Sequence, residues 1–232
     1  MTQAISSAPS RERPSTGESE RLSDIAYRRV LEGLFDRTVP AGAFVSQSEL
    51  VNLLGIPVQP LRDALRVLEA EGVLTIHPRS GIQFLKPDLE LARSTYQFRT
   101  IIERAAARRF AETGDARTIA ALIRDHEALK ARIEGGAFGP DVLDELDSIE
   151  DRLHGEMLAS LRNPLVENTA RRLKNYVRLI RLERLVTQPL ALHTLREHLD
   201  ILHAIEARDG EAAERALAAH FQAALQRILG MF

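Results

Sequence analysis

Three histidines and one carboxylate in the second half of the sequence have types and spacings that suit a divalent metal ion. His198 lies 12 residues before Gly210, and His220 lies 10 residues after it. If these segments are helices packed as an antiparallel hairpin, both imidazoles lie at nearly the same height above the turn. Glu150 and His154 are four residues apart, so a helix places them on one face. The sequence therefore predicts a metal site formed by Glu150, His154, His198 and His220.

The ligand types indicate which metal such a site would hold. Imidazole nitrogens with one carboxylate oxygen favour Zn²⁺, and Ni²⁺ and Mn²⁺ are alternatives. The competing interpretation is that each histidine is an ordinary packed, hydrogen-bonded or surface residue. The matched heights of His198 and His220 favour the metal site. His77, His126 and His193 have no comparable partner in the sequence, and we expect them to be surface or packing residues.

A second group of candidate residues has the side chains that contact DNA. Arg62 and Arg66 are four residues apart on the polar face of a predicted helix, and Arg79 lies at the tip of a predicted hairpin. One duplex could meet all three arginines at once. The alternative is that they are solvated surface charges, and their joint occurrence in this arrangement favours DNA contact.

Two short helices and a hairpin must position these arginines. Apolar residues at helical spacing predict helices over 46–54 and 58–71, with Gly55 ending the first. The β-prone runs 73–77 and 82–85 are joined by turn residues and predict a hairpin. An amphipathic segment, 21–37, predicts a supporting helix. This arrangement is typical of a winged helix-turn-helix, which presents its second helix to the major groove.

A helical bundle must position the metal ligands. From residue 89 to the end, the pattern is helical and is interrupted five times, at 113–115, 134–140, 162–164, 188–189 and 208–210. The predicted fold is therefore mainly α, with an all-α bundle of about six helices after the winged helix-turn-helix. The predicted domains are a disordered tail over 1–20, a DNA-binding domain over 21–86 and an all-helical domain over 87–232.

Composition narrows the classes of protein. Residues 21–86 hold 8 Lys or Arg and 7 Asp or Glu, so DNA affinity has to come from individually placed arginines rather than a basic surface. The absence of cysteine excludes disulfides and thiolate metal sites. The sequence has neither the apolar core of a signal peptide nor an apolar run long enough to span a bilayer, which predicts a cytoplasmic protein without a membrane partner.

These motifs, in this order, resemble the GntR family of bacterial transcription regulators, in its FadR-type subgroup with a C-terminal helical domain called FCD. The first half carries the family pattern at 40–42, 49–50, 54–56, 60–65, 68–72 and 80–81. In the second half, the FCD pattern is matched by Arg99 with Glu103, His154 with Asn163-Pro164, Glu197-His198 and His220. The resemblance extends from about Ile25 to Leu229.

The resemblance implies a function and partners. The expected function is a repressor that binds double-stranded operator DNA as a homodimer and responds to a small carboxylate effector held near a metal in the helical domain. A metal-dependent enzyme that acts on a small organic acid is the alternative, but it gives the winged helix no role. The candidate effector contacts are Arg99, by resemblance, and Arg178; both could instead be bundle-surface arginines with packed stems. The candidate DNA contacts are Ser48, Gln59, Arg62, Arg66, Arg79, Ser80 and Gly81.

The sequence departs from the family pattern at three points. Where the family opens its recognition helix with Ser-Arg-Thr-Pro, this chain has Pro57-Val-Gln-Pro60, so a capping serine and a DNA-contacting arginine are missing. Ser48 replaces a further arginine, and we expect weaker, less salt-sensitive operator binding. Glu150 stands where the first metal ligand is usually Asp, and Asp147 and Asp151 are rivals for that role.

Overall fold

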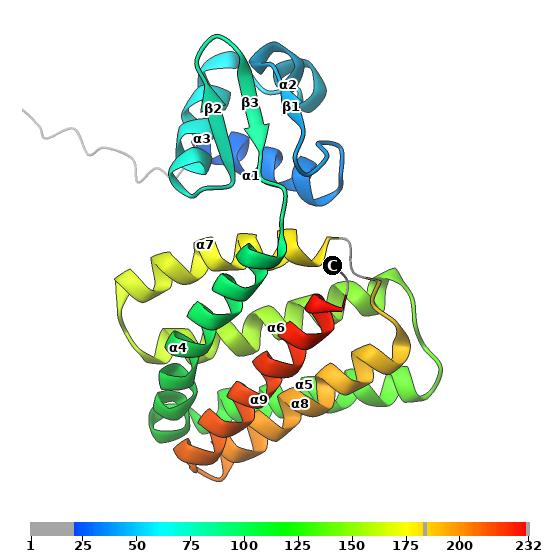
Figure 1. The fold of residues 1–232 in the computed structure, drawn as a ribbon. Coiled ribbons are helices and arrows are strands. Elements are labelled where there is room, and N and C mark those ends of the chain that lie inside the picture. Colours follow the sequence, from blue (N-terminus) through cyan, green and yellow to red (C-terminus); the bar gives the residue numbers. More distant parts are fainter. Residues whose placement is uncertain (1–20, 183–184, 231–232) are drawn as a thin grey trace, which may run out of the picture.

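The computed structural model describes residues 21–182 and 185–230. Within these ranges, a small unit of three helices and a three-stranded sheet is followed by a larger unit of six helices (Figure 1). This order of elements confirms the predicted fold class, a winged helix-turn-helix followed by an all-α bundle of about six helices. The tail that the sequence predicts to be disordered, residues 1–20, lies outside the described ranges.

The first unit contains the predicted helix-turn-helix and wing. Its helices pack around one apolar core that includes Leu34, Leu50, Leu61, Leu68 and Phe84. The elements are α1 (Leu22–Phe35), β1 (Phe44–Val45), α2 (Gln47–Leu54), α3 (Val58–Ala70), β2 (Leu74–His77) and β3 (Gly81–Phe84).

Local sequence signals explain where α2 begins and ends. The Ser46 hydroxyl accepts a hydrogen bond from the Glu49 backbone N–H, and the Glu49 side chain accepts one from the Ser46 N–H, which forms a capping box. Gly55 ends α2 in the left-handed conformation that favours glycine. By contrast, α3 begins at Val58 after Pro57 without a side-chain cap.

The sheet contains one strand that periodicity did not predict. β1 is only two residues long, too short to show an alternating pattern, and it pairs with β3 through Phe44 opposite Gln83 and Val45 opposite Ile82. The sheet order is β1-β3-β2, with antiparallel neighbours. Gly81 allows the close approach of β1, because a Cβ at this position would lie 2.8 Å from the Val45 carbonyl oxygen.

The second unit places the predicted metal ligands on three different helices. The helices are α4 (Leu89–Thr113), α5 (Ala116–Glu134), α6 (Pro140–Ser160), α7 (Pro164–Arg181), α8 (Gln188–Glu206) and α9 (Gly210–Leu229). Helices α8 and α9 pack against each other across the break at Gly210, as the predicted helical hairpin with His198 and His220 at matching heights requires. None of the helices in 21–182 and 185–230 is both long and apolar enough to cross a membrane.

Helix α7 lies on the side of the helical unit that faces the winged unit (Figure 1). Leu179 is 1% exposed and belongs to the apolar core of the first unit; its burial contributes about 1.5–3 kcal/mol. The Asn175 amide donates to the Tyr27 hydroxyl, which donates to Glu71, and the Tyr176 hydroxyl donates to the Glu71 carbonyl. Burial and the Glu71 carboxylate raise the pKa of Tyr27 to about 12, so the hydroxyl remains a donor at neutral pH.

Candidate functional site

His154 on α6, His198 on α8 and His220 on α9 form one buried group, which we call the histidine cluster. One ring nitrogen from each lies within 4.8 Å of the others, and the three residues are between 0 and 6% exposed. A zinc ion binds imidazole nitrogens at about 2.0–2.1 Å, so two nitrogens on one ion lie at most about 4.2 Å apart, and a small rotation of the imidazoles would let all three bind one ion. The structure thus brings together all three predicted histidine ligands.

Two carboxylates fix the tautomers of His154 and His220. The His154 Nδ1–H donates to Glu103 Oε2 at 2.6 Å, and the His220 Nδ1–H donates to Glu197 Oε2 at 2.8 Å. Each imidazole is therefore left with a lone pair on Nε2. Both Nε2 atoms are buried and have no hydrogen-bond partner among the described residues. Carboxylate–histidine pairs of this kind are the usual support for metal-binding imidazoles.

His198 has no hydrogen-bond partner among the described residues at either ring nitrogen, although it is fully buried. Burial and the neighbouring His220 hold the pKa of His198 well below its ordinary value, and burial also lowers the pKa of His220. A metal binds only the neutral imidazole. Because a buried polar atom without a partner is costly, the unpartnered nitrogens of the cluster fit a bound divalent ion.

The candidate carboxylate ligand stands outside the histidine cluster. Glu150 is 8% exposed, and its Oε1 accepts a hydrogen bond from the Arg181 guanidinium at 2.6 Å. Although burial raises the pKa of Glu150, the charge of Arg181 and the nearby histidines outweigh it and hold the pKa well below its ordinary value. Of its rivals, Asp151 pairs with Lys174 at 2.7 Å, and burial raises the pKa of Asp147. Glu150 therefore stays the predicted fourth ligand, with Arg181 as a competing partner.

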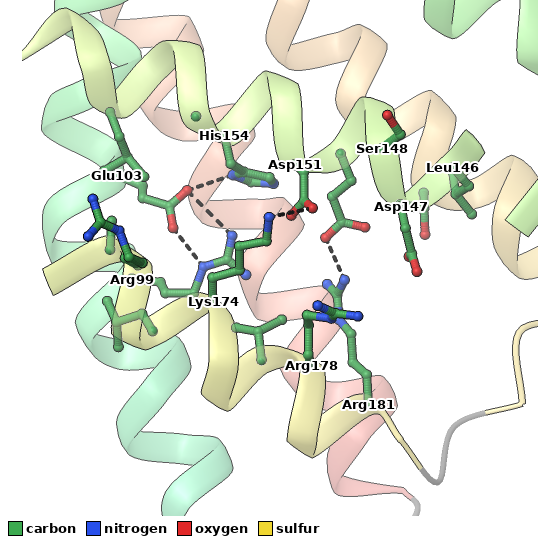
Figure 2. A pocket seen from close by; sticks show the side chains of 18 of the residues that line it. Arg99, Glu103, Leu146, Asp147, Ser148, Asp151, His154, Lys174, Arg178 and Arg181 are labelled. Atoms are coloured by element: carbon green, nitrogen blue, oxygen red, sulfur yellow. Dashed lines mark hydrogen bonds and ion pairs between the residues drawn. The ribbon is translucent and has the colours of Figure 1, made fainter. Parts of the chain in front are cut away.

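A cavity of about 1030 Å³ opens beside the cluster and is lined from α1, α4, α6, α7, α8 and α9. His154 and His220 form part of its wall. Both predicted effector arginines, Arg99 and Arg178, line it as well and are labelled with His154 in Figure 2. This volume suits a small organic ligand. Arg171, Arg181 and Arg227 also line the cavity, so five arginines contribute to its wall.

Arg99 is held in place from two sides. Its Nε donates to Glu103 Oε1 at 2.6 Å, and its guanidinium carbon lies 4.5 Å from the centroid of the Phe221 ring. Burial raises the pKa of Glu103, but the charges of Arg99 and His154 outweigh it and bring that pKa to about 2. The Nη1 of Arg99 is buried without a partner among the described residues. Arg99 is therefore not a bundle-surface arginine, and it retains a donor for a ligand.

Arg178 lies at the border between the two units. Its side chain is exposed, and its guanidinium carbon lies 3.8 Å from the centroid of the Phe35 ring on α1. Phe35 also lines the cavity, so one wall belongs to the winged unit. A cation–π contact at an exposed position contributes about 0.5–1 kcal/mol, which is weak enough for a ligand to compete with it.

The predicted DNA contacts lie on the exposed side of the winged unit. Arg62, Arg66 and Arg79 are exposed, and none makes a hydrogen bond or ion pair within 21–182 and 185–230. Arg79 adopts φ +66° at the hairpin tip, a left-handed conformation that is uncommon for a side chain of this size. Gln59 is exposed and donates to Asp63. The remaining predicted contacts are Ser48 and Ser80, which are exposed, and Gly81, which is partly buried.

The sequence interpretation missed the residues that support the cluster. Glu103 and Glu197 belong to the motifs of the resemblance, but they had no predicted role. Their signal was an i, i+4 partner: Arg99 forms an ion pair with Glu103, and the His193 Nε2 lies 2.9 Å from Glu197 Oε1. Arg227 also donates two hydrogen bonds to Glu197, from Nη1 to Oε1 at 2.9 Å and from Nη2 to Oε2 at 3.0 Å. Burial raises the pKa of Glu197, but the hydrogen bonds from His220 and Arg227 outweigh it and bring that pKa to about 2.

Comparison with known proteins finds a family match for each of the two units. Residues 22–84 match the bacterial regulatory proteins of the gntR family, and residues 94–223 match the FCD domain. The HTH-type transcriptional repressor RspR of Escherichia coli K12 is 28% identical over 198 residues, which cover 84% of each chain. The structure of E. coli McbR/YncC superimposes with a TM-score of 0.72 at 18% identity and covers 91% of this chain and 99% of its own. The structure described as the metal-free FCD domain of TM0439 covers 62% of this chain, with a TM-score of 0.50 and 17% identity.

The two matches follow the order of the units described above. The gntR match covers α1 to β3, and the FCD match covers most of the helical unit, including the three histidines of the cluster. These families are transcription regulators, so they favour a regulator over the alternative of a metal-dependent enzyme. The chain belongs to the GntR family of bacterial regulatory proteins, and its helical half is an FCD domain.

Proposed function

We propose that this GntR-family regulator is a repressor whose binding to operator DNA is weakened by a small organic acid bound beside a metal ion in the FCD domain. The observation that carries the proposal is the histidine cluster, whose buried, unpartnered Nε2 atoms of His154 and His220 belong to the wall of a cavity that also contains arginines. The cytoplasm is the proposed location, because the operator lies there. The name of the similar E. coli protein, a repressor, supports the sign of regulation.

The residues of the cavity suit an anionic ligand. His154, His198 and His220 would hold the metal, preferentially Zn²⁺, with Glu150 as the proposed fourth ligand. The bound metal would supply a positive site that accepts a carboxylate oxygen. Arg99 keeps an unpartnered Nη1 donor, which can bind the same ligand by a charge-assisted hydrogen bond. The wall also carries six carboxylates, among them Glu103 and Glu150, so the proposed ligand class rests on the metal and on Arg99 rather than on the overall charge of the cavity.

The proposal is tested by titrating a fluorescent operator fragment, taken from the promoter of the protein's own gene, with the zinc-loaded protein. We expect one acid in a panel of gluconate, malate, succinate and glutamate to raise the operator Kd at least tenfold, about 1.4 kcal/mol. The same acid should have no effect on the protein after EDTA treatment and dialysis. Equal operator affinity with and without every acid, in both metal states, would contradict the proposal.

Helix α7 can carry the effector signal to the DNA-binding unit. One side of the helix contributes Lys174, Arg178 and Arg181 to the cavity, and another side contributes Asn175 and Leu179 to the contact with the winged unit. A ligand that draws Arg178 away from Phe35 therefore changes a contact between the two units directly. We propose that this pair couples the effector site to the placement of the recognition helices.

Replacing Phe35 by leucine tests this coupling, because leucine keeps apolar volume but removes the ring beneath Arg178. We expect normal metal content and normal operator affinity without effector, together with an operator response to the active acid that is at least threefold smaller. Phe138→Leu is the matched control, since Phe138 is also partly exposed but does not line the cavity. An unchanged response in the Phe35→Leu protein would exclude this pair from the coupling.

The regulator is proposed to act as a homodimer on a pseudo-palindromic operator. One recognition helix reads too few base pairs for adequate specificity, and a two-fold dimer doubles the site that is read. Light scattering is expected to give about twice the chain mass of 25.9 kDa for the free protein and for the protein on its operator. A monomer mass in both states would refute the dimer.

A further inference from the structure

A metal-bound His198 would need a hydrogen-bond acceptor for its second ring nitrogen. When an imidazole binds a metal through one nitrogen, the other nitrogen carries a proton that requires a hydrogen-bond acceptor. His154 and His220 have such acceptors in Glu103 and Glu197, but both nitrogens of His198 are without a partner among the described residues. His198 is 0% exposed, so bulk water cannot serve. Metal binding would therefore leave a buried N–H of His198 unsatisfied unless a neighbour accepts it.

His126 on α5 is the neighbour with a suitable acceptor. Its ring centroid lies 5.4 Å from that of His198, with the ring planes 71° apart. The His126 Nδ1–H donates to the Leu122 carbonyl at 2.7 Å, which leaves a lone pair on Nε2. That Nε2 is buried and has no partner among the described residues, and His126 is 0% exposed.

His126 is not itself one of the candidate metal ligands. The nitrogens that lie within 4.8 Å of one another belong to His154, His198 and His220, and His126 offers none to that group. Its contact with the cluster is with His198, the one member without a carboxylate partner. We propose that His126 is the positioning residue of the metal site, whose Nε2 accepts the N–H of His198 and thereby holds His198 in the tautomer and orientation that bind the ion.

This role differs from simple packing in a way that two substitutions can measure. His126→Leu fills the same buried space without an acceptor, whereas His126→Gln places an amide oxygen near the position of Nε2. If His126 only packs, both variants bind metal like the wild type or both lose affinity together. If it positions His198, the leucine variant alone loses affinity, because the His198 N–H has no acceptor in the loaded state. This inference rests on the proposed metal site but not on effector binding or on operator control.

The experiment is a Zn²⁺ competition titration of each full-length variant against a chromophoric chelator, with thermal melting of the metal-free proteins as a check on the fold. We expect His126→Leu to bind Zn²⁺ roughly 10–100-fold more weakly than the wild type and His126→Gln to remain within about threefold. The metal-free melting temperatures should be similar. Wild-type affinity in the leucine variant, or equal losses in both variants, would overturn the proposal. A wild type that binds no Zn²⁺ would overturn it together with the metal site, whereas loss of operator control alone would leave it standing.

Discussion

Replacing His198 and His220 together by alanine is expected to reduce the metal content from one divalent ion per chain to none. The two residues supply two of the three clustered nitrogens, and a single imidazole cannot hold the ion against competing buffer ligands. Elemental analysis of the purified protein measures this directly. His203→Ala is the matched control, because His203 lies on α8 like His198 but is exposed. Full metal content in the double variant would eliminate the histidine cluster as the site.

The same metal should stabilise the FCD domain. An ion present at 1,000 times its Kd stabilises the folded state by about 4 kcal/mol, provided that the unfolded chain does not bind it. EDTA should therefore lower the melting temperature of the wild type, and added Zn²⁺ should restore it. The double variant should melt at one temperature with and without EDTA. A wild-type melting temperature that EDTA leaves unchanged would mean that the ion contributes nothing to stability.

Arg62→Ala is expected to cost about 1–3 kcal/mol of specific operator binding, because Arg62 is exposed on α3 and makes no hydrogen bond or ion pair with another described residue. Fluorescence anisotropy with operator and with scrambled DNA separates specific from non-specific affinity. Arg79→Ala at the hairpin tip should weaken both affinities with a smaller loss of discrimination. Neither change should alter the melting temperature. Operator affinity equal to the wild type in the Arg62→Ala protein would show that α3 does not read this operator.

The spacing of apolar residues in the sequence was sufficient to predict the helices that bury a regular apolar stripe. The stripe of Leu61, Leu65 and Leu68 defined α3, and the breaks between helical segments placed all six bundle helices. The same spacing was a poor guide where an element is too short to show a repeating pattern. β1 has two residues. On α2, a helix of eight residues, Leu50 is buried, but Leu53, at helical spacing from it, is 51% exposed.

The clustering of the three histidines was predictable because their spacings fit a helical or hairpin geometry. His198 and His220 could be placed from their distances to one turn, and His154 from its spacing to Glu150. The residues that support the ligands come from helices with no fixed sequence relation to them. His126 and His198 are brought together only by the packing of α5 on α8, and Arg181 reaches Glu150 from α7. Such contacts depend on tertiary packing, so the sequence alone left His126 as a surface or packing residue.

The most direct test of the central claim is the operator titration of the His198→Ala, His220→Ala protein in the presence and absence of the acid that acts on the wild type. The apolar core of the winged unit takes Leu179 from α7 but no residue from α8 or α9, so the double variant should bind operator with wild-type affinity when no acid is present. The predicted result is that saturating acid then leaves its operator Kd unchanged, while the wild-type Kd rises at least tenfold. A double variant that releases the operator at the same acid concentration as the wild type would contradict the claim that the histidine cluster holds the effector through a metal.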